Sequence, residues 1–190
     1  WQYLRRKAKP YRQKLTAETR GRINDRVSIH KRPQVVEDRS RIGDWEADTI
    51  IGQNHKQAIV TLVERRTGLL KMKRVTNKTA LLVADAMIDL LTPVKLHVKT
   101  ITSDNGKEFA DHKGVKQNLF SPFYFADVYA SWQRGTNENT NGLIREYLPK
   151  GCDFRQVSDD EVQAIENRLN DRPRKRLGFK TPNQVFYDII

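Results

Sequence analysis

Three acidic residues lie at positions where a carboxylate could bind a metal ion or take part in a reaction: Asp48, Asp104 and Glu138. Asp48 lies in the middle of an expected strand, where a carboxylate packed under a helical layer is costly unless it is paired or binds a metal. Asp104 follows the end of another expected strand, and ligands of open α/β sheets gather outside such ends. Glu138 lies on an expected helix. If these elements converge, the three acids form a site for hard divalent ions such as Mg²⁺, which prefer oxygen ligands.

Each acid also has a purely structural interpretation. Asp104 begins the sequence Asp104-Asn105-Gly106, a common turn that an aspartate side chain stabilises. Asp48 and Glu46 would lie on a strand face that meets solvent, and Glu138 would lie on a solvated face of its helix. A site of two metal ions ~3.5–4 Å apart, able to hold the attacking and leaving oxygens of a phosphoryl displacement, requires all three acids together.

The segment around Glu138 favours a functional role. On a helix, Glu138, Asn141, Gly142 and Arg145 share one face. Asparagine and glycine are poor helix formers, so this segment departs from what stability alone would select. Trp132, just before it, is expected to pack in the core rather than to stack on a base.

The chain is strongly basic, and the excess positive charge is concentrated near the amino end. The 190 residues carry 35 Lys+Arg and 23 Asp+Glu, a net charge of +12. Residues 1–43 hold 13 of the basic and 4 of the acidic residues, and they include too few large apolar residues to become ordered by themselves. This asymmetry favours a phosphate-bearing partner. The alternative is a solvated linker.

We therefore predict a basic arm over 1–43 that contacts DNA, followed by one domain over 44–190. The residues of the arm expected to touch phosphates are Arg5, Arg6, Lys7 and Arg12. In the domain, Arg145 and a second basic cluster are expected to bind DNA, although plain solvation would also explain the cluster. Its members are Arg172, Arg174, Lys175 and Arg176.

Several protein classes are excluded. The single cysteine, Cys152, rules out an internal disulfide framework and a multi-cysteine zinc site. No apolar run approaches the ~20 residues of a membrane helix, and the first residues never become apolar enough for a signal peptide. We expect a cytoplasmic, DNA-associated protein with no membrane partner, and because the chain begins at Trp1 we expect a fragment of a longer one.

The spacing of apolar residues predicts an α/β fold. Strands are expected at 44–52, 57–64, 69–75, 95–103 and 118–125, and helices at 80–91, 107–116, in the second half of 132–148 and at 159–170. Short turns between the first three strands predict an antiparallel meander. The later strands alternate with helices, so the whole predicts a mixed sheet flanked by helices.

Three blocks of the sequence resemble the acidic blocks of the IS30-family DDE transposases, which belong to the retroviral integrase superfamily. These blocks are 45–52, 102–109 and 134–139, and 33 residues separate Asp104 from Glu138 as in that family. The approach at 32–43 and the tail at 170–182 are also similar. The resemblance covers roughly residues 27–190.

The resemblance implies an RNase H-like fold in which Asp48, Asp104 and Glu138 are both the catalytic residues and the metal ligands, with two Mg²⁺ (or Mn²⁺) ions per active site. It implies a helix-turn-helix region that finds the transposon ends and is missing from this sequence, so that 1–43 would be its linker. The implied partners are transposon-end and target DNA, and synapsis of two ends requires a homodimer or a higher assembly.

The function implied is the catalytic core of a transposase or integrase. Metal-dependent hydrolysis at a transposon end would free a 3′-hydroxyl, and that hydroxyl would then be transferred into target DNA. Two alternatives stay open at this point. One is an RNase H-like nuclease that cuts and never joins, and the other is a DNA-binding or assembly module without catalysis.

Overall fold

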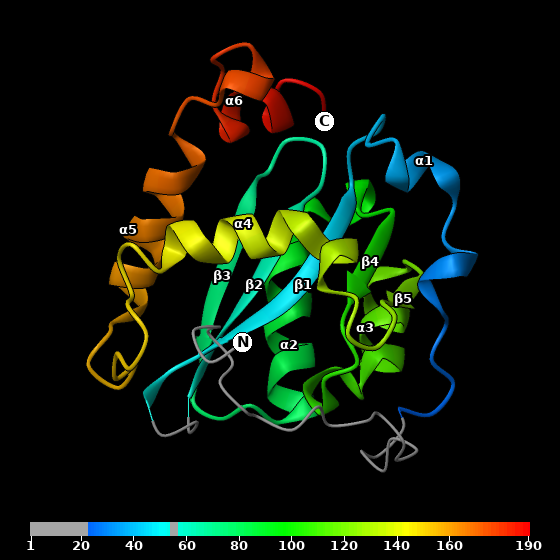
Figure 1. Cartoon of the computed structure of the whole chain (residues 1–190), viewed down its shortest axis with the longest axis horizontal. Coiled ribbons are helices and arrows are strands. Elements are labelled where there is room, and N and C mark those ends of the chain that lie inside the picture. The colour runs from blue at the N-terminus through cyan, green and yellow to red at the C-terminus, as the bar shows by residue number, and fades with distance from the viewer. Residues whose placement is uncertain (1–22, 54–56) are drawn as a thin grey trace, which may run out of the picture.

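The structure is a computed structural model that describes residues 23–53 and 57–190. At its centre is a five-stranded sheet with the strand order β3-β2-β1-β4-β5 (Figure 1). The first three strands pair antiparallel, and the β1–β4 and β4–β5 pairs are parallel. The strands are β1 (Asp44–Ile51), β2 (Ala58–Glu64), β3 (Leu70–Val75), β4 (Thr100–Ser103) and β5 (Phe123–Phe125). The predicted mixed sheet with an antiparallel meander is confirmed.

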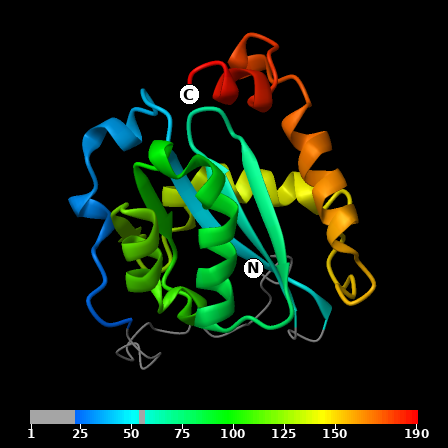
Figure 2. The same ribbon diagram turned by 180° about the vertical axis from the view of Figure 1, so that it is seen from behind.

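Helices cover both faces of the sheet. They are α1 (Gln34–Glu37), α2 (Ala80–Leu91), α3 (His112–Leu119), α4 (Gly135–Ile144), α5 (Asp159–Asn170) and α6 (Pro182–Tyr187). Short 3₁₀ turns lie at Ile29–Lys31, Thr92–His97, Lys107–Phe109, Ser131–Arg134 and Lys175–Leu177. Helix α4 crosses one face and α2 covers the other (Figures 1 and 2). In the described ranges, no helix is long and apolar enough to cross a membrane.

Each face of the sheet has its own apolar core, because successive strand residues point to opposite sides. In β1, Trp45 and Ala47 belong to the core shared with α2 and α3, and Ile50 belongs to the core shared with α4 and α5. Glu46 and Asp48 alternate in step with Ile50. Both carboxylates therefore point toward α4.

Two expected strands begin later than the apolar pattern suggested. The segment predicted as a strand from 95 opens as the turn Thr92–His97, with a proline near its start, and the strand begins at Thr100. The segment predicted as a strand from 118 completes α3 and leaves it at Phe120, in a left-handed conformation. In both places, apolar residues that would also suit a strand belong to a helical turn.

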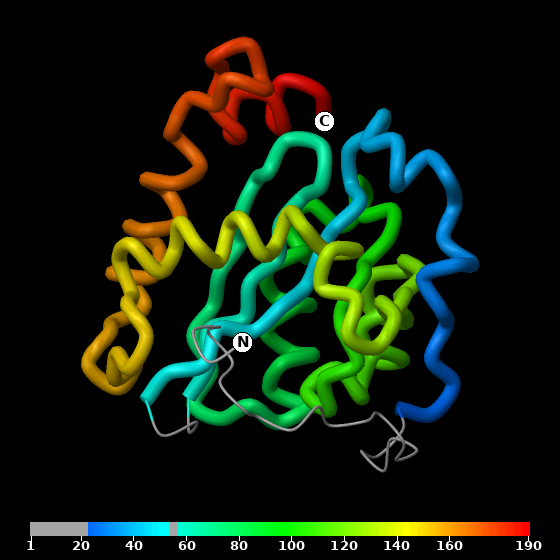
Figure 3. Tube along the Cα trace, in the orientation of Figure 1, coloured from blue at the N-terminus to red at the C-terminus, as the bar shows by residue number. Residues whose placement is uncertain are grey.

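The described part of the amino-terminal segment, residues 23–43, runs along the β5 side of the sheet (Figure 3). The backbone N–H of Phe125 donates to Val27 O at 2.8 Å, and Ser28 forms a parallel bridge with Phe125. Val36 is fully buried. This stretch therefore gains its order by packing on the domain. Residues 1–22, with the expected DNA contacts Arg5, Arg6, Lys7 and Arg12, lie outside the described residues, and the boundary at 43 stays a prediction.

Candidate active site

The register of β1 and β4 brings Asp48 and Asp104 to the same level of the sheet. These strands pair in parallel from Asp44 opposite Thr100 to Glu46 opposite Thr102, an offset of 56 residues. The same offset relates Asp48 to Asp104, which lie two residues further along. Two acids far apart in the sequence thus become neighbours.

Asp48 is held from two sides. Its Oδ1 accepts a hydrogen bond from the backbone N–H of Thr49, and its Oδ2 accepts one from Asn141 Nδ2 on α4, both at 2.9 Å. Burial raises the pKa of Asp48, and the nearby charge of Asp104 acts in the same direction. The positive charge of Arg134 and the two hydrogen bonds oppose this rise. A bound cation would therefore find a partly desolvated carboxylate with a fixed orientation.

The two oxygens of Asp104 have different roles. Its Oδ1 accepts a hydrogen bond from the backbone N–H of Gly106 at 2.8 Å, which closes the turn. Its Oδ2 faces Arg134. Position 106 has no room for a side chain, since a Cβ there would lie 2.4 Å from Glu108 Oε2 and 2.9 Å from Asp104 Oδ1. The turn interpretation of Asp104 and its place beside Asp48 are thus compatible.

Arg134 bridges the two aspartates. Its Nη1 lies 3.5 Å from Asp48 Oδ2, and its Nη2 lies 3.3 Å from Asp104 Oδ2. The side chain is only 11% exposed, and its buried Nε has no hydrogen-bond partner in the part of the chain that the structure describes. One guanidinium thus lies between two carboxylates. The sequence signals this only by placing an arginine four residues before Glu138.

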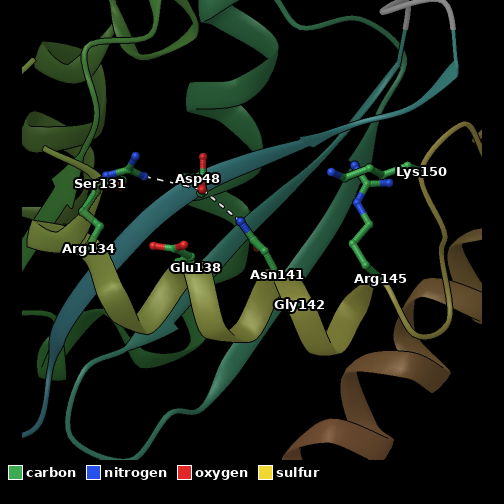
Figure 4. A pocket seen from close by; sticks show the side chains of 8 residues that line it. All are labelled: Asp48, Ser131, Arg134, Glu138, Asn141, Gly142, Arg145 and Lys150. Atoms are coloured by element: carbon green, nitrogen blue, oxygen red, sulfur yellow. Dashed lines mark hydrogen bonds and ion pairs between the residues drawn. The ribbon is translucent and has the colours of Figure 1, made fainter. Parts of the chain in front are cut away.

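Glu138 lies on α4 beside these groups, at the edge of an open pocket of about 470 Å³. The pocket is lined by Asp48, Ser131, Arg134, Glu138, Asn141, Gly142, Arg145 and Lys150 (Figure 4). Among the described residues, the exposed carboxylate of Glu138 forms no hydrogen bond or ion pair. It projects from the same side of α4 as Asn141, toward Asp48 (Figure 4).

The chemistry of these donors suits a hard divalent ion, although the acids are not gathered around one point. Within residues 23–53 and 57–190, no three His, Cys, Asp or Glu side chains form a group that could hold a metal ion. A cation does lie between Asp48 and Asp104, because the guanidinium of Arg134 pairs with both. Oxygen-only donors that already share a cation fit Mg²⁺ or Mn²⁺ if Arg134 moves away.

Helix α4 is positioned by the strand beneath it rather than by its own composition. Glu46 is fully buried, and its Oε2 accepts a hydrogen bond from the backbone N–H of Asn137 at 3.0 Å. Its Oε1 pairs with Arg65 Nη1 at 2.5 Å. The expectation that the polar face of β1 meets solvent does not hold for Glu46. Two residues further along β1, Asp48 makes the next contact to α4 through Asn141.

Arg145, an expected DNA contact, already has partners within the protein. Arg145 lines the pocket and donates to Leu148 O and Pro149 O through Nη1 and to Ile51 O through Nη2, at 3.0 to 3.3 Å. This geometry ties the end of α4 to β1. Lys150, which the sequence analysis did not single out, also lines the pocket.

The basic cluster Arg172, Arg174, Lys175 and Arg176 does not line the pocket. Arg174 donates to Leu169 O at 3.0 Å and Arg176 to Arg66 O at 2.6 Å, so two of its guanidinium groups bind main-chain carbonyls. Arg172 lies 3.9 Å from Glu146. Trp132 was expected in the core, and that expectation is wrong: the side chain is 75% exposed.

The sequence has clear relatives, although no family model matches it. It is 50% identical over 189 residues to the transposase for insertion sequence element IS4351 of Bacteroides fragilis, covering 99% of this chain and 58% of the relative. It is 39% identical over 170 residues to the transposase InsI for insertion sequence element IS30A of Escherichia coli K12, covering 87% and 44%. The chain thus spans about half the length of the curated relatives it matches.

Solved structures of integrases share the fold. The catalytic core domain of BIV integrase aligns with a TM-score of 0.60 and 22% identity, covering 77% of this chain and 95% of that one. A chain of the simian T-cell lymphotropic virus intasome in complex with PP2A regulatory subunit B56 gamma aligns with a TM-score of 0.64 and 17% identity, covering 77% of this chain and 55% of that one. The described domain therefore has the fold of a retroviral integrase catalytic core, and over nearly all its length the chain is a homologue of the IS30-family transposases.

Proposed function

We propose that this chain is the catalytic core of a DNA transposase. The observation that carries the proposal is the pairing of Asp48 and Asp104 with one shared guanidinium, beside a pocket lined by the carboxylate of Glu138, which pairs with none of the residues that the structure describes. The relatives named above are transposases. In this proposal residues 44–190 form the catalytic domain and 1–43 link it to a DNA-recognition region.

The reaction has two phosphoryl transfers. Water attacks a phosphorus at the transposon end, the bond to the 3′-oxygen breaks, and a 3′-hydroxyl is released. That hydroxyl then attacks a phosphorus of target DNA, joins to it, and displaces the 3′-oxygen of the target strand. The number of phosphodiester bonds is unchanged in the second step, so no external energy source is required.

The carboxylates of Asp48, Asp104 and Glu138 are the proposed ligands of two Mg²⁺ or Mn²⁺ ions. Such ions lower the pKa of an attacking water and stabilise the negative charge that develops at phosphorus. The backbone N–H groups of Thr49 and Gly106 orient the two aspartates, so that binding of metal requires Arg134 to move but little movement of the two carboxylates.

The cations of the pocket complement the substrate. Arg134, Arg145 and Lys150 all line it, and phosphate oxygens are the natural partners of such a group. Arg134 has a double role in this proposal. It neutralises the two aspartates in the unloaded protein and binds a DNA phosphate once metal has replaced it. Joining two transposon ends to one target requires at least two copies of the chain.

A hydrolytic nuclease of the same fold is the main alternative, and a DNA-binding module without catalysis is a weaker one. The nuclease would cut by the first transfer alone. Catalytic decay commonly removes an acid, whereas all three are present in this chain. Strand joining separates the two enzymatic functions, because only the transposase uses a 3′-hydroxyl as nucleophile.

The test is a branched duplex that mimics the product of strand transfer, incubated with the protein in Mg²⁺ or Mn²⁺. We expect metal-dependent resealing of the target strand, lost in Glu138→Gln. The matched control is Glu146→Gln, since Glu146 is exposed on the same part of the chain and does not line the pocket. Cutting without resealing would favour the nuclease. Binding without chemistry in either metal would favour the module.

A further inference from the structure

Trp132 is exposed at a position where exposure is costly. Its side chain is 75% accessible, whereas Trp45, in the core, is fully buried. A tryptophan carries a large apolar surface, and tryptophan is enriched at binding surfaces because its ring is apolar while its N–H is polar. The core does not use this residue, so its role must be sought outside.

Trp132 lies in a turn that borders the candidate active site. Trp132 belongs to the turn Ser131–Arg134, and both end residues of that turn line the pocket. Figure 4 shows Ser131 and Arg134 at one end of α4, with Arg145 and Lys150 at the other. The exposed Trp132 therefore shares its turn with the cation Arg134, and the other two cations of the pocket lie at the far end of α4.

The loop that carries Trp132 is braced by hydrogen bonds. Gln133 Oε1 accepts from the backbone N–H of Asp127 at 2.8 Å, and Gln133 Nε2 donates to Asp127 Oδ2 at 2.9 Å. His30, from the amino-terminal segment, reaches the same carboxylate at 2.7 Å. Ala130, in the same loop, is buried, and Tyr129 adopts a φ of 63°, a left-handed conformation rare outside glycine.

These contacts fix the backbone around Trp132 before any ligand arrives. Ordering a loop costs conformational entropy, and a braced loop has met that cost at folding rather than at binding. A strained residue within a braced loop next to a site is the pattern expected where presentation of a side chain matters. The backbone conformation that exposes the indole of Trp132 is therefore already formed before a ligand binds.

We propose that Trp132 is a stacking platform for an unpaired base of DNA, next to the phosphate that the pocket binds. This inference rests on the proposed function and names a structural feature of its substrate. An aromatic ring beside cations is the usual way to hold single-stranded nucleic acid, because every base has a face that can stack. The cations Arg134, Arg145 and Lys150 favour DNA over a protein partner at this pocket.

The consequence is a preference for DNA ends that are frayed or single-stranded over intact duplex. Stacking of one base contributes about 5- to 150-fold to affinity. Because stacking depends little on which base is present, the preference should be for an unpaired nucleotide and not for a sequence.

The test compares the binding of a blunt duplex with that of the same duplex bearing a short overhang on either strand, with 2-aminopurine as a fluorescent base in the overhang. Binding is measured with the 190-residue chain without metal, so that no cutting intervenes. We expect wild type to prefer an overhang by at least about fivefold and to quench the 2-aminopurine. Trp132→Ala should lose both effects, and Trp132→Phe should retain most of them.

The matched control is Phe120→Ala. Phe120 is 83% exposed and lies at the end of α3. Helix α3 packs on the face of the sheet opposite to α4. The Phe120→Ala variant should behave as wild type. If Trp132→Ala keeps the preference for overhangs, the stacking proposal is wrong. It is also wrong if Trp132→Ala instead changes the sedimentation coefficient of the free protein, because the ring is then a protein contact.

Failure of the proposed function would look different. One outcome is that wild type prefers overhangs and Trp132→Ala loses this preference, while the branched substrate shows no metal-dependent chemistry. In that case the stacking proposal is supported and the catalytic assignment is wrong. If the branched substrate is resealed while the preference is absent in wild type, the catalytic assignment holds and the platform does not.

Discussion

The carboxylate of Glu46 accepts a hydrogen bond from the backbone N–H of Asn137, 3.0 Å away and one residue before Glu138. Glu46 is fully buried, and its other oxygen pairs with Arg65, whose side chain is 4% exposed. A strand residue two positions before one candidate acid thus binds the first turn of the helix that carries another. Thr136, Asn137 and Thr140 make the buried face of that helix largely polar, so apolar packing alone would hold it poorly.

Replacement of Glu46 should therefore destabilise the whole domain. Among the described residues, Glu46→Ala leaves the buried guanidinium of Arg65 with Glu37 as its one carboxylate partner, beside the carbonyl of Val36, and loss of one member of a buried pair costs about 3–5 kcal/mol. Glu46→Gln retains an acceptor for Asn137 and should cost less. Urea unfolding of the two variants measures both values. A loss below about 1 kcal/mol in Glu46→Ala, a typical value for an exposed pair, would show that the pair does not anchor α4.

Removal of Arg134 should strengthen binding of a divalent ion to the free protein. The guanidinium competes with metal for Asp48 and Asp104, so Arg134→Ala should raise the affinity for Mn²⁺ by about tenfold, which corresponds to about 1.4 kcal/mol. Isothermal titration without DNA measures this directly. Arg172→Ala, which removes an exposed arginine outside the pocket, is the control for net charge. Equal or weaker Mn²⁺ binding in Arg134→Ala would contradict competition between the two cations.

Glu166 should make stability depend on pH far from the candidate site. It lies on α5 and accepts a hydrogen bond from the backbone N–H of Met72 on β3 at 2.5 Å. Burial raises its pKa above the ordinary value of 4.5, although Met72, Lys71 and Gln163 act against the rise. An acid whose pKa is higher in the folded state binds its proton more tightly there. Its contribution to stability is present below pH 4.5 and is lost as the pH rises through the folded-state pKa.

Glu166→Gln removes this titration and keeps an oxygen that can accept from Met72. The free energy of unfolding of the variant, relative to wild type, should therefore increase between pH 4.5 and neutrality. The difference between the two proteins matters here, because Asp48 and Glu64 are also acids whose pKa burial raises. Unfolding titrations at several pH values measure it. A constant difference across this range would show that Glu166 does not titrate there.

The elements that depend on local interactions were predictable. Helix α5 begins after Ser158 and has a capping box with Glu161, and α2 begins after Thr79, whose side chain caps it. Both signals involve residues only a few positions apart. The starts of β4 and β5 were not predictable, because a strand begins where its neighbour supplies hydrogen bonds. For β4 the neighbouring group is Gly43 O, which accepts from the backbone N–H groups of Lys99 and Thr100.

The residues that surround the three acids could not be predicted from the sequence. Nothing in the local pattern places Arg134 between Asp48 and Asp104, since its two ion pairs depend on how a helix crosses a sheet. The exposure of Trp132 was missed for a related reason. A tryptophan near a helix usually packs inward, and here the braced turn before α4 directs it to solvent.

The amino-acid sequence by itself determined the identity and order of the acids, the alternation that turns Glu46 and Asp48 to one side of β1, and the basic character of the chain. These follow from residue types and from periods of a few residues. Only the tertiary structure decided the register that sets Asp48 beside Asp104, the arginine that joins them, and the packing of residues 23–43 along the sheet. Those features depend on burial and on pairing between segments that are distant in the sequence. Such interactions contribute free energy only once the chain has folded.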